Sequence, residues 1–209
     1  MKRLFLASNA GNVAKDIAKE LLPENKRILF IKTASEVYGD NPEWLEEDRS
    51  KLKSAGFSVF DYTITNKSEN DLKQELKEKD IIFMSGGNSY YLLEKIQQSN
   101  TGKVLKEAVD SGIPYIGSSA GSVIAGPSIK PVGKLDDIDK APNLKGFKAL
   151  GLVDFVVYPH WGFEKYRDES NENIKENYVK DYKFILLTDN QYVRVEGDMY
   201  KIEEIEKNI

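Results

Sequence analysis

The feature that most constrains this 209-residue chain is an alternation of short apolar runs with longer amphipathic stretches. Such an alternation is typical of a parallel β-sheet whose connecting helices cover both faces. The run Ile81-Ile82-Phe83-Met84 is apolar on successive residues, which indicates a strand buried on both sides. The expected strands are Arg3–Ala7, Arg27–Lys32, Ser58–Thr63, Asp80–Met84, Tyr115–Ser118, Phe155–Tyr158 and Phe184–Thr188.

The stretches between these runs carry Leu and Ile at helical spacing, with charged residues on the opposite side. One segment breaks this rhythm: Ser128–Lys145 contains two prolines and several aspartates, and we expect it to form a long surface loop. The expected helices are Asn12–Leu22, Pro42–Ala55, Ser68–Lys77, Ser89–Gln97, Gly102–Ser111 and Phe163–Lys180.

A hairpin is expected near the carboxyl end, where Gln191–Val195 and Met199–Ile202 flank Glu196-Gly197-Asp198. It would add an antiparallel edge to the parallel sheet. The fold prediction is therefore an α/β fold with a doubly wound, mostly parallel sheet and an antiparallel edge hairpin. The length fits a single domain over residues 1–209.

The composition excludes several kinds of function. The chain has no cysteine and one histidine, so a thiolate nucleophile is impossible and most metal sites are excluded; we expect no cofactor and no metal. A net charge of -4 argues against a nucleic-acid partner. The first apolar run ends at Asn9, short of the roughly 7–15 residues of a signal peptide, and no run approaches the roughly 20 needed to span a bilayer. We expect a cytoplasmic protein without a membrane partner.

The segment from Tyr115 to Ser122 contains the pattern Gly-x-Ser-x-Gly, which fits only with Ser119 at its centre. The pattern lies between an expected strand and the start of a helix. A serine at such a turn sits at a helix amino terminus, where free N–H groups favour a developing negative charge. Ser119 is therefore the candidate nucleophile, against the alternative that it only caps the next helix.

A second glycine turn, Gly86-Gly87, also follows an expected strand and precedes a helix. In a parallel sheet it would lie at the same carboxyl edge as Ser119. The N–H groups of Gly87 and Ala120 are therefore the candidate oxyanion donors. The alternative is a tight turn that binds a phosphate or nothing at all.

His160, the single histidine, stands just beyond the expected strand Phe155–Tyr158. A serine needs a base that is neutral near pH 7, and imidazole supplies it. Asp189 follows another expected strand and is the preferred orienter of His160, with Asp136 or Asp137 in the long loop as alternatives.

These motifs together resemble the peptidase E (dipeptidase E) family of serine peptidases, which also includes cyanophycinases. The resemblance implies a flavodoxin-like sheet related to class I glutamine amidotransferase domains. It also implies Ser119 as nucleophile, His160 as base, and Gly87 with Ala120 as oxyanion donors, with the acid near Asp136 or Asp189. The motifs that carry it are Ser85-Gly86-Gly87-Asn88, Gly117-Ser118-Ser119-Ala120-Gly121, Ala125-Gly126-Pro127 and Pro159-His160.

Peptidase E removes amino-terminal aspartate from dipeptides, and it binds the substrate carboxylate with an arginine beyond the catalytic histidine. In this chain Ser170 stands where that arginine is expected, and Arg167 lies nearby. Strict specificity for aspartate is therefore not expected. Asn88 and Arg167 are the expected substrate-binding residues, and Asp136 and Asp137 would favour the free amine of a substrate.

The expected activity is hydrolysis of di- or tripeptides by a serine exopeptidase or dipeptidase through an acyl-enzyme. The expected partner is a small peptide, and the chain would act as a monomer or homodimer. Two alternatives stay open: an esterase or amidase with the same residues, and a non-catalytic module whose glycine turns bind a small ligand.

Overall fold

The main sheet is built from strands β1 (Arg3–Ala7), β2 (Arg27–Ile31), β3 (Ser58–Tyr62), β4 (Ile81–Met84), β5 (Tyr115–Ser118), β8 (Gln191–Glu196) and β9 (Met199–Glu204). In the computed structural model, which describes residues 1–24, 26–177 and 182–205, they pair in the order β3-β2-β4-β5-β1-β8-β9. The pairs from β3 to β1 are parallel, whereas β8 and β9 are antiparallel to their neighbours. This arrangement confirms the expected fold class.

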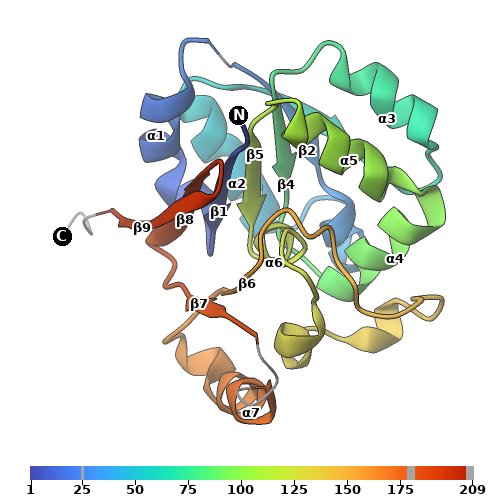
Figure 1. Ribbon diagram of the computed structural model, residues 1–209, viewed down its shortest axis with the longest axis vertical. Helices are drawn as coiled ribbons and strands as arrows, with labels where there is room; N and C mark the ends of the chain where they lie inside the picture. The colour runs from blue at the N-terminus through green and yellow to red at the C-terminus, as the bar shows by residue number, and fades with distance from the viewer. Residues whose placement is uncertain (25, 178–181, 206–209) are drawn as a thin grey trace.

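Helices cover both faces of this sheet (Figure 1). Their bounds are α1 (Ala10–Leu21), α2 (Glu43–Ser54), α3 (Glu69–Leu76), α4 (Ser89–Ser99), α5 (Thr101–Asp110), α6 (Ala120–Val123) and α7 (Arg167–Asn177). One core joins α1 and α2 to a face of the sheet, and the other joins the opposite face to α3, α4, α5 and α6. The inner parallel strands β1, β2, β4 and β5 are therefore covered on both sides, as their apolar runs predict, whereas β3 lies at the edge of the sheet and is partly exposed.

Local sequence signals explain where helix α1 begins and which side it buries. The side chain of Asn9 caps the helix by accepting a hydrogen bond from the N–H of Asn12, at 3.1 Å. Val13, Ile17 and Leu21 follow at four-residue spacing and are fully buried. Because the helix starts directly after β1, its amino terminus lies at the carboxyl edge of the sheet.

The strands β6 (Val156–Tyr158) and β7 (Phe184–Leu186) differ from the expectation, because they form a parallel sheet of their own. The reason lies in β1, whose two edges are already paired with β5 and β8. The apolar side chains of β6 instead pack into the core on the α6 face of the main sheet.

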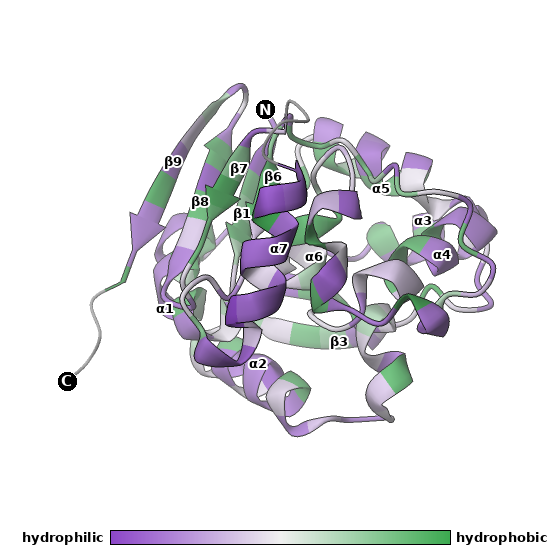
Figure 2. Cartoon of the chain, turned by 90° about the horizontal axis from the view of Figure 1, so that it is seen from below, coloured by the Kyte–Doolittle hydropathy of each residue, from purple (hydrophilic) through white to green (hydrophobic). Residues whose placement is uncertain are grey.

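Two other segments also differ from expectation. Ser128–Lys145 is only partly a surface loop: it contains 3-10 turns at Lys130–Leu135 and Ile138–Lys140, and Val132 is buried. The expected helix Phe163–Lys180 becomes a short turn followed by α7, and its residues 178–180 lie outside the described residues. The polar character of α7 is plain in Figure 2. No helix within residues 1–24, 26–177 and 182–205 is long and apolar enough to cross a membrane.

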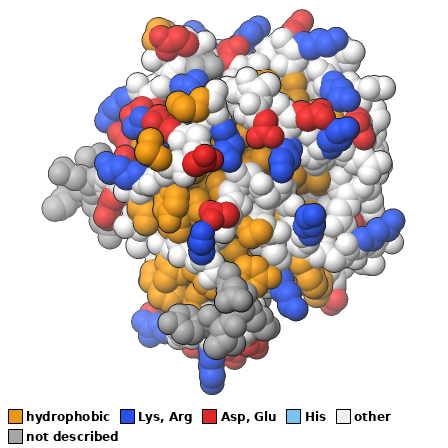
Figure 3. Space-filling view, in the orientation of Figure 1, with side chains coloured by type: hydrophobic (Ala, Val, Ile, Leu, Met, Phe, Trp, Pro, Cys, Tyr) orange, Lys and Arg blue, Asp and Glu red, His pale blue; other side chains and the backbone are white. Residues whose placement is uncertain are grey.

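The outer strand of the hairpin presents apolar side chains to solvent. Met199, Tyr200 and Ile202 on β9 are 75%, 52% and 47% exposed. Hydrophobic side chains gather over this hairpin in Figure 3. The charged residues Lys201, Glu203 and Glu204 interrupt the strand, which is a common protection of sheet edges against pairing with other chains.

Phe83 provides a test of the packing between β2 and β4. Its ring stacks on Phe30 with centroids 4.6 Å apart, and both residues are fully buried. We expect Phe83→Ala to lower the free energy of unfolding by about 3–5 kcal/mol, because it leaves a cavity in the core. Urea unfolding measures the change. Phe60→Ala, at a side chain 45% exposed on β3, is the control and should cost less than about 1 kcal/mol; similar losses would contradict this packing.

Candidate active site

Ser119 lies at the turn between β5 and α6, in a backbone conformation that residues other than glycine rarely adopt. Its φ is 49° and its ψ is -110°. The turn is tight because α6 passes close to β4: a Cβ added at Gly121 would lie 2.0 Å from the carbonyl oxygen of Met84. A glycine at this position is therefore a steric requirement of the turn, as the Gly-x-Ser-x-Gly pattern suggested.

Hydrogen bonds to the end of β1 hold this turn in place. The N–H of Ser119 and the hydroxyl of Ser122 both donate to the carbonyl oxygen of Ala7, at 3.1 Å and 2.7 Å. In the parallel register Ala7 lies opposite Ser118, so the two strands end together. The strained residue is thus fixed from the neighbouring strand.

The glycine turn after β4 lies against Ser119. A Cβ added at Gly86 would be 3.4 Å from the Cβ of Ser119. Gly87 has a φ of 132°, and a Cβ there would meet the carbonyl oxygen of Ala34 at 2.1 Å. Within the described residues, the N–H groups of Gly87 and Ala120 have no hydrogen-bond partner. Both N–H groups are therefore available to an acceptor.

His160 follows β6 and reaches back to Ser119. Its Nε2 lies 2.9 Å from the Oγ of Ser119, within hydrogen-bonding distance. Like Ser119, His160 has a positive φ, of 57°. Both side chains remain partly accessible, so a small molecule can reach them.

Asp189 completes a chain of hydrogen bonds from Ser119. Its Oδ1 lies 2.7 Å from the Nδ1 of His160. Burial alone would raise the pKa of Asp189, but the hydrogen bond and charge of His160, together with the Ser8 hydroxyl, outweigh burial and hold that pKa below its usual value. Asp189 is therefore an ionised acceptor at neutral pH.

Sequence reasoning missed Ser8, which holds this pair together. The hydroxyl of Ser8 donates to Oδ1 of Asp189 at 2.5 Å and accepts from the backbone N–H of His160 at 2.7 Å. Asn12 adds a hydrogen bond from its amide to the carbonyl oxygen of Asp189, at 3.1 Å. The available signal was the position of Ser8, directly after the apolar run of β1 at the same sheet edge.

The two alternative acids do not bond to His160. Asp136 accepts from the N–H and the hydroxyl of Ser89, at 2.9 Å and 2.6 Å. Burial raises the pKa of Asp136, against the opposing effects of Ser89 and of charge on His160. Asp137 is exposed, and its carboxylate accepts from the N–H of Asp139.

The expected substrate-binding residues are engaged elsewhere. Asn88 is fully buried: its oxygen caps α4 through the N–H of Tyr91, and its amide donates to the carbonyl oxygen of Asp137. Arg167 is exposed and forms an ion pair with Glu164. Ser170 is buried on α7, and its uncharged hydroxyl supplies no positive charge where the arginine was expected.

Aromatic side chains surround the site on two sides. The ring of Tyr166 lies 5.6 Å from that of His160, and Phe163 packs beside Tyr166. On the other side, Trp44 lies against Gly86 and contacts Tyr38 edge to face, with centroids 6.2 Å apart. These side chains form apolar walls around the Ser119–His160 pair.

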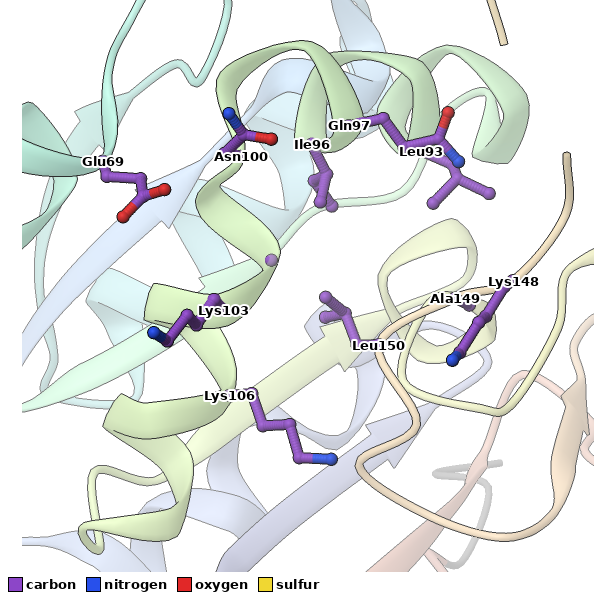
Figure 4. Close-up of a pocket in the computed structure, with 11 residues that line it drawn as sticks. Glu69, Leu93, Ile96, Gln97, Asn100, Lys103, Lys106, Lys148, Ala149 and Leu150 are labelled. Carbon is purple, nitrogen blue, oxygen red and sulfur yellow. The ribbon is translucent and has the colours of Figure 1, made fainter. Parts of the chain in front are cut away.

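A separate cavity of about 600 Å³ lies between α4, α5 and residues 148–150 (Figure 4). Lys103, Lys106 and Lys148 surround it, but neither Ser119 nor His160 lines it. It is therefore distinct from the candidate active site. Among the described residues, no group of three or more His, Asp or Glu side chains is arranged to hold a metal ion.

Gly87 gives a test of the turn beside Ser119. We expect Gly87→Ala to destabilise the protein by about 3 kcal/mol or more, because the new methyl group would overlap the backbone of Ala34 in addition to straining φ. Thermal and urea unfolding measure the loss. Gly39→Ala is the control, because Gly39 has a φ of 101° and nothing within 4 Å of the added Cβ. It should cost only about 1–2 kcal/mol; equal losses would contradict the close approach at Gly87.

Comparisons with known proteins identify the family of this chain. The model of peptidase family S51 matches residues 4–203. An uncharacterized peptidase of Pasteurella multocida is 35% identical over 164 residues, covering 77% of this chain and 78% of the relative. A peptidase E of a Nostoc species is 30% identical, covering 97% and 83%. The crystal structure of a Listeria monocytogenes protein assigned as a peptidase E superposes with a TM-score of 0.90 at 28% identity, covering 99% and 100%. The chain belongs to peptidase family S51, the peptidase E family of serine peptidases.

Proposed function

We propose that this peptidase is an exopeptidase that hydrolyses di- and tripeptides through Ser119, His160 and Asp189. The observation that carries the proposal is the continuous chain of hydrogen bonds from Ser119 Oγ through the imidazole to Asp189, at 2.9 Å and 2.7 Å. A serine, a base and an acid in this sequence of contacts form the arrangement that activates a hydroxyl for acyl transfer.

In the first step His160 Nε2 takes the proton of Ser119 Oγ, and the oxygen attacks the carbonyl carbon of the scissile peptide bond. The carbonyl oxygen becomes an oxyanion, which the N–H groups of Gly87 and Ala120 would stabilise. His160 then gives its proton to the leaving amine as the carbon–nitrogen bond breaks. An acyl ester on Ser119 remains, and water activated by His160 hydrolyses it.

Asp189 would keep His160 in the tautomer that this reaction needs, with the proton on Nδ1. Its ionised carboxylate accepts a hydrogen bond from Nδ1–H, which keeps the proton on Nδ1 and leaves the lone pair of Nε2 directed at Ser119. The hydroxyl of Ser8 donates to the same oxygen and so stabilises the negative charge of Asp189. The imidazolium formed during the reaction is stabilised in turn by this charge.

The surroundings of the site support small peptides with a free amino terminus as substrates. Oδ1 of Asp136 has no hydrogen-bond partner among the described residues, and no lysine or arginine of those residues forms an ion pair with this carboxylate. This oxygen offers a hydrogen-bond acceptor to a substrate ammonium group. Because Ser170 replaces the expected arginine and Arg167 pairs with Glu164, an amino-terminal aspartate would not be strictly required.

The first prediction of this proposal concerns the nucleophile. A fluorophosphonate probe should label wild-type protein and not Ser119→Ala, because the reaction needs the activated hydroxyl. Hydrolysis of a dipeptide library should disappear in the same variant. Intact-mass spectrometry measures the labelling. Ser111→Ala, at an exposed serine on the far end of α5, is the matched control and should label as wild type does. Labelling that survives Ser119→Ala would show that another residue is the nucleophile.

The second prediction tests Asp189 against the exposed alternative acid, Asp137. We expect Asp189→Asn to lower kcat by roughly 10³- to 10⁴-fold, because the amide would favour the wrong proton position on His160. Asp137→Asn should change kcat by less than about twofold, because that carboxylate is exposed and does not contact His160. Steady-state kinetics on a cleaved dipeptide measures both. A larger loss in Asp137→Asn than in Asp189→Asn would reverse the assignment.

A further inference from the structure

A carboxylate that takes no part in the proposed chemistry lies directly behind the nucleophile turn. Asp48, on α2, is only 6% exposed. Its Oδ2 accepts the hydroxyl of Ser118, the residue before Ser119, at 3.1 Å. Its Oδ1 accepts the N–H of Gly11 in the first turn of α1, also at 3.1 Å. One side chain of α2 therefore binds both the end of β5 and the beginning of α1.

Ser118 makes this contact part of a closed network. Its hydroxyl donates to Asp48 and accepts the N–H of Ala10, at 3.1 Å. The end of β5 and the β1–α1 turn are thus joined twice, once directly through Ala10 and once through Asp48. Both joints lie within one residue of the strained Ser119.

The β1–α1 turn also carries the groups that hold the other half of the site. Ser8 bonds to His160 and Asp189, and Asn12 bonds to the carbonyl oxygen of Asp189. Lys51, one turn after Asp48 on α2, donates to Asn12 at 2.8 Å. Hydrogen bonds thus run from the residue before the nucleophile, through α2 and α1, to the acid that orients the histidine.

The neighbouring backbone approaches this carboxylate closely, and its burial lowers the stability of the folded state. A Cβ at Gly11 would lie 2.5 Å from Oδ1 of Asp48, so a glycine is needed for the approach. Burial raises the pKa of Asp48 to about 6, against the opposing effects of Ser118, Gly11 and Lys51. At neutral pH the protein therefore contains a buried, ionised carboxylate whose charge destabilises the folded state.

We infer that Asp48 is a positioning residue of the proposed reaction: through Ser118 it fixes the Ser119 turn relative to the β1–α1 turn that holds His160 and Asp189. The inference rests on the proposed function of Ser119. A serine hydroxyl must be held within a few tenths of an ångström of its base, and a misplacement of about 1 Å can cost about a hundredfold in rate. Asp48 is a buried group that bonds to both sides of this alignment.

The test measures the rate at which a fluorophosphonate modifies Ser119, because this rate needs no knowledge of the natural substrate. Ser118→Ala and Asp48→Ala should each lower the limiting modification rate by about tenfold or more and leave the half-saturating probe concentration within about threefold. Asp48→Asn should stay within about threefold of wild type, because its amide can bond to the same two partners. Asp110→Ala, at an exposed aspartate ending α5, is the control.

The double variant shows whether the two residues act together. Asp48→Ala with Ser118→Ala should react no more slowly than the slower single variant, because both remove one interaction. Unfolding of a variant would reduce the fraction of protein that is labelled, whereas misplacement of Ser119 would reduce the rate at which each folded molecule is modified. Ser118→Ala keeps the bond between Asp48 and Gly11, so it provides the test if Asp48→Ala fails to fold.

Three results would overturn the inference while leaving the proposed function intact: a rate in Ser118→Ala within twofold of wild type, losses that multiply in the double variant, or a loss in Asp48→Asn equal to that in Asp48→Ala. Failure of the probe to label Ser119 in wild-type protein would instead contradict the proposed function itself.

Discussion

The geometry of the site depends on the carbonyl oxygen of Ala7, which accepts hydrogen bonds from the N–H of Ser119 and the hydroxyl of Ser122. These bonds fix the unfavourable backbone of Ser119 to the end of the neighbouring parallel strand. Ser8, the residue directly after that strand, holds His160 and Asp189. Two adjacent strand ends therefore define where the hydroxyl of Ser119 and the imidazole of His160 meet, and the register of β1 against β5 determines the spacing between them.

Much of the fold follows from the sequence pattern, because strands buried on both faces have continuous apolar runs and the helices between them have one apolar side. The exception is the pair β6 and β7, whose residues read as strands of the main sheet but pair only with each other. The sequence of Phe155–Tyr158 contains no information about which edge is free. The edge of β1 that is not paired with β5 is paired with β8, which comes later in the chain. Whether β6 joins the main sheet therefore depends on competition with a distant segment.

In the candidate site too, local sequence patterns reveal some residues, whereas only three-dimensional contacts reveal the others. Ser119 and His160 are visible in the sequence because a glycine-bracketed turn and a single histidine are local features. Asp189 was harder to separate from Asp136, because both lie near the edge and only the three-dimensional contact distinguishes them. Ser8 and Asp48 have no motif at all. Their roles arise from hydrogen bonds to residues more than 30 positions away, which composition and periodicity do not encode.

The separation of the site along the chain has a consequence during synthesis. Ser119 is made about 40 residues before His160 and about 70 before Asp189, because each of the three follows a different strand. At roughly 5–20 residues per second, the ribosome needs several seconds to add the later pair. Throughout that interval the emerging chain carries Ser119 without the full set of residues proposed to activate it. With the roles proposed for these residues, the peptidase would stay inert beside the other nascent chains of the cell until Asp189 has been made.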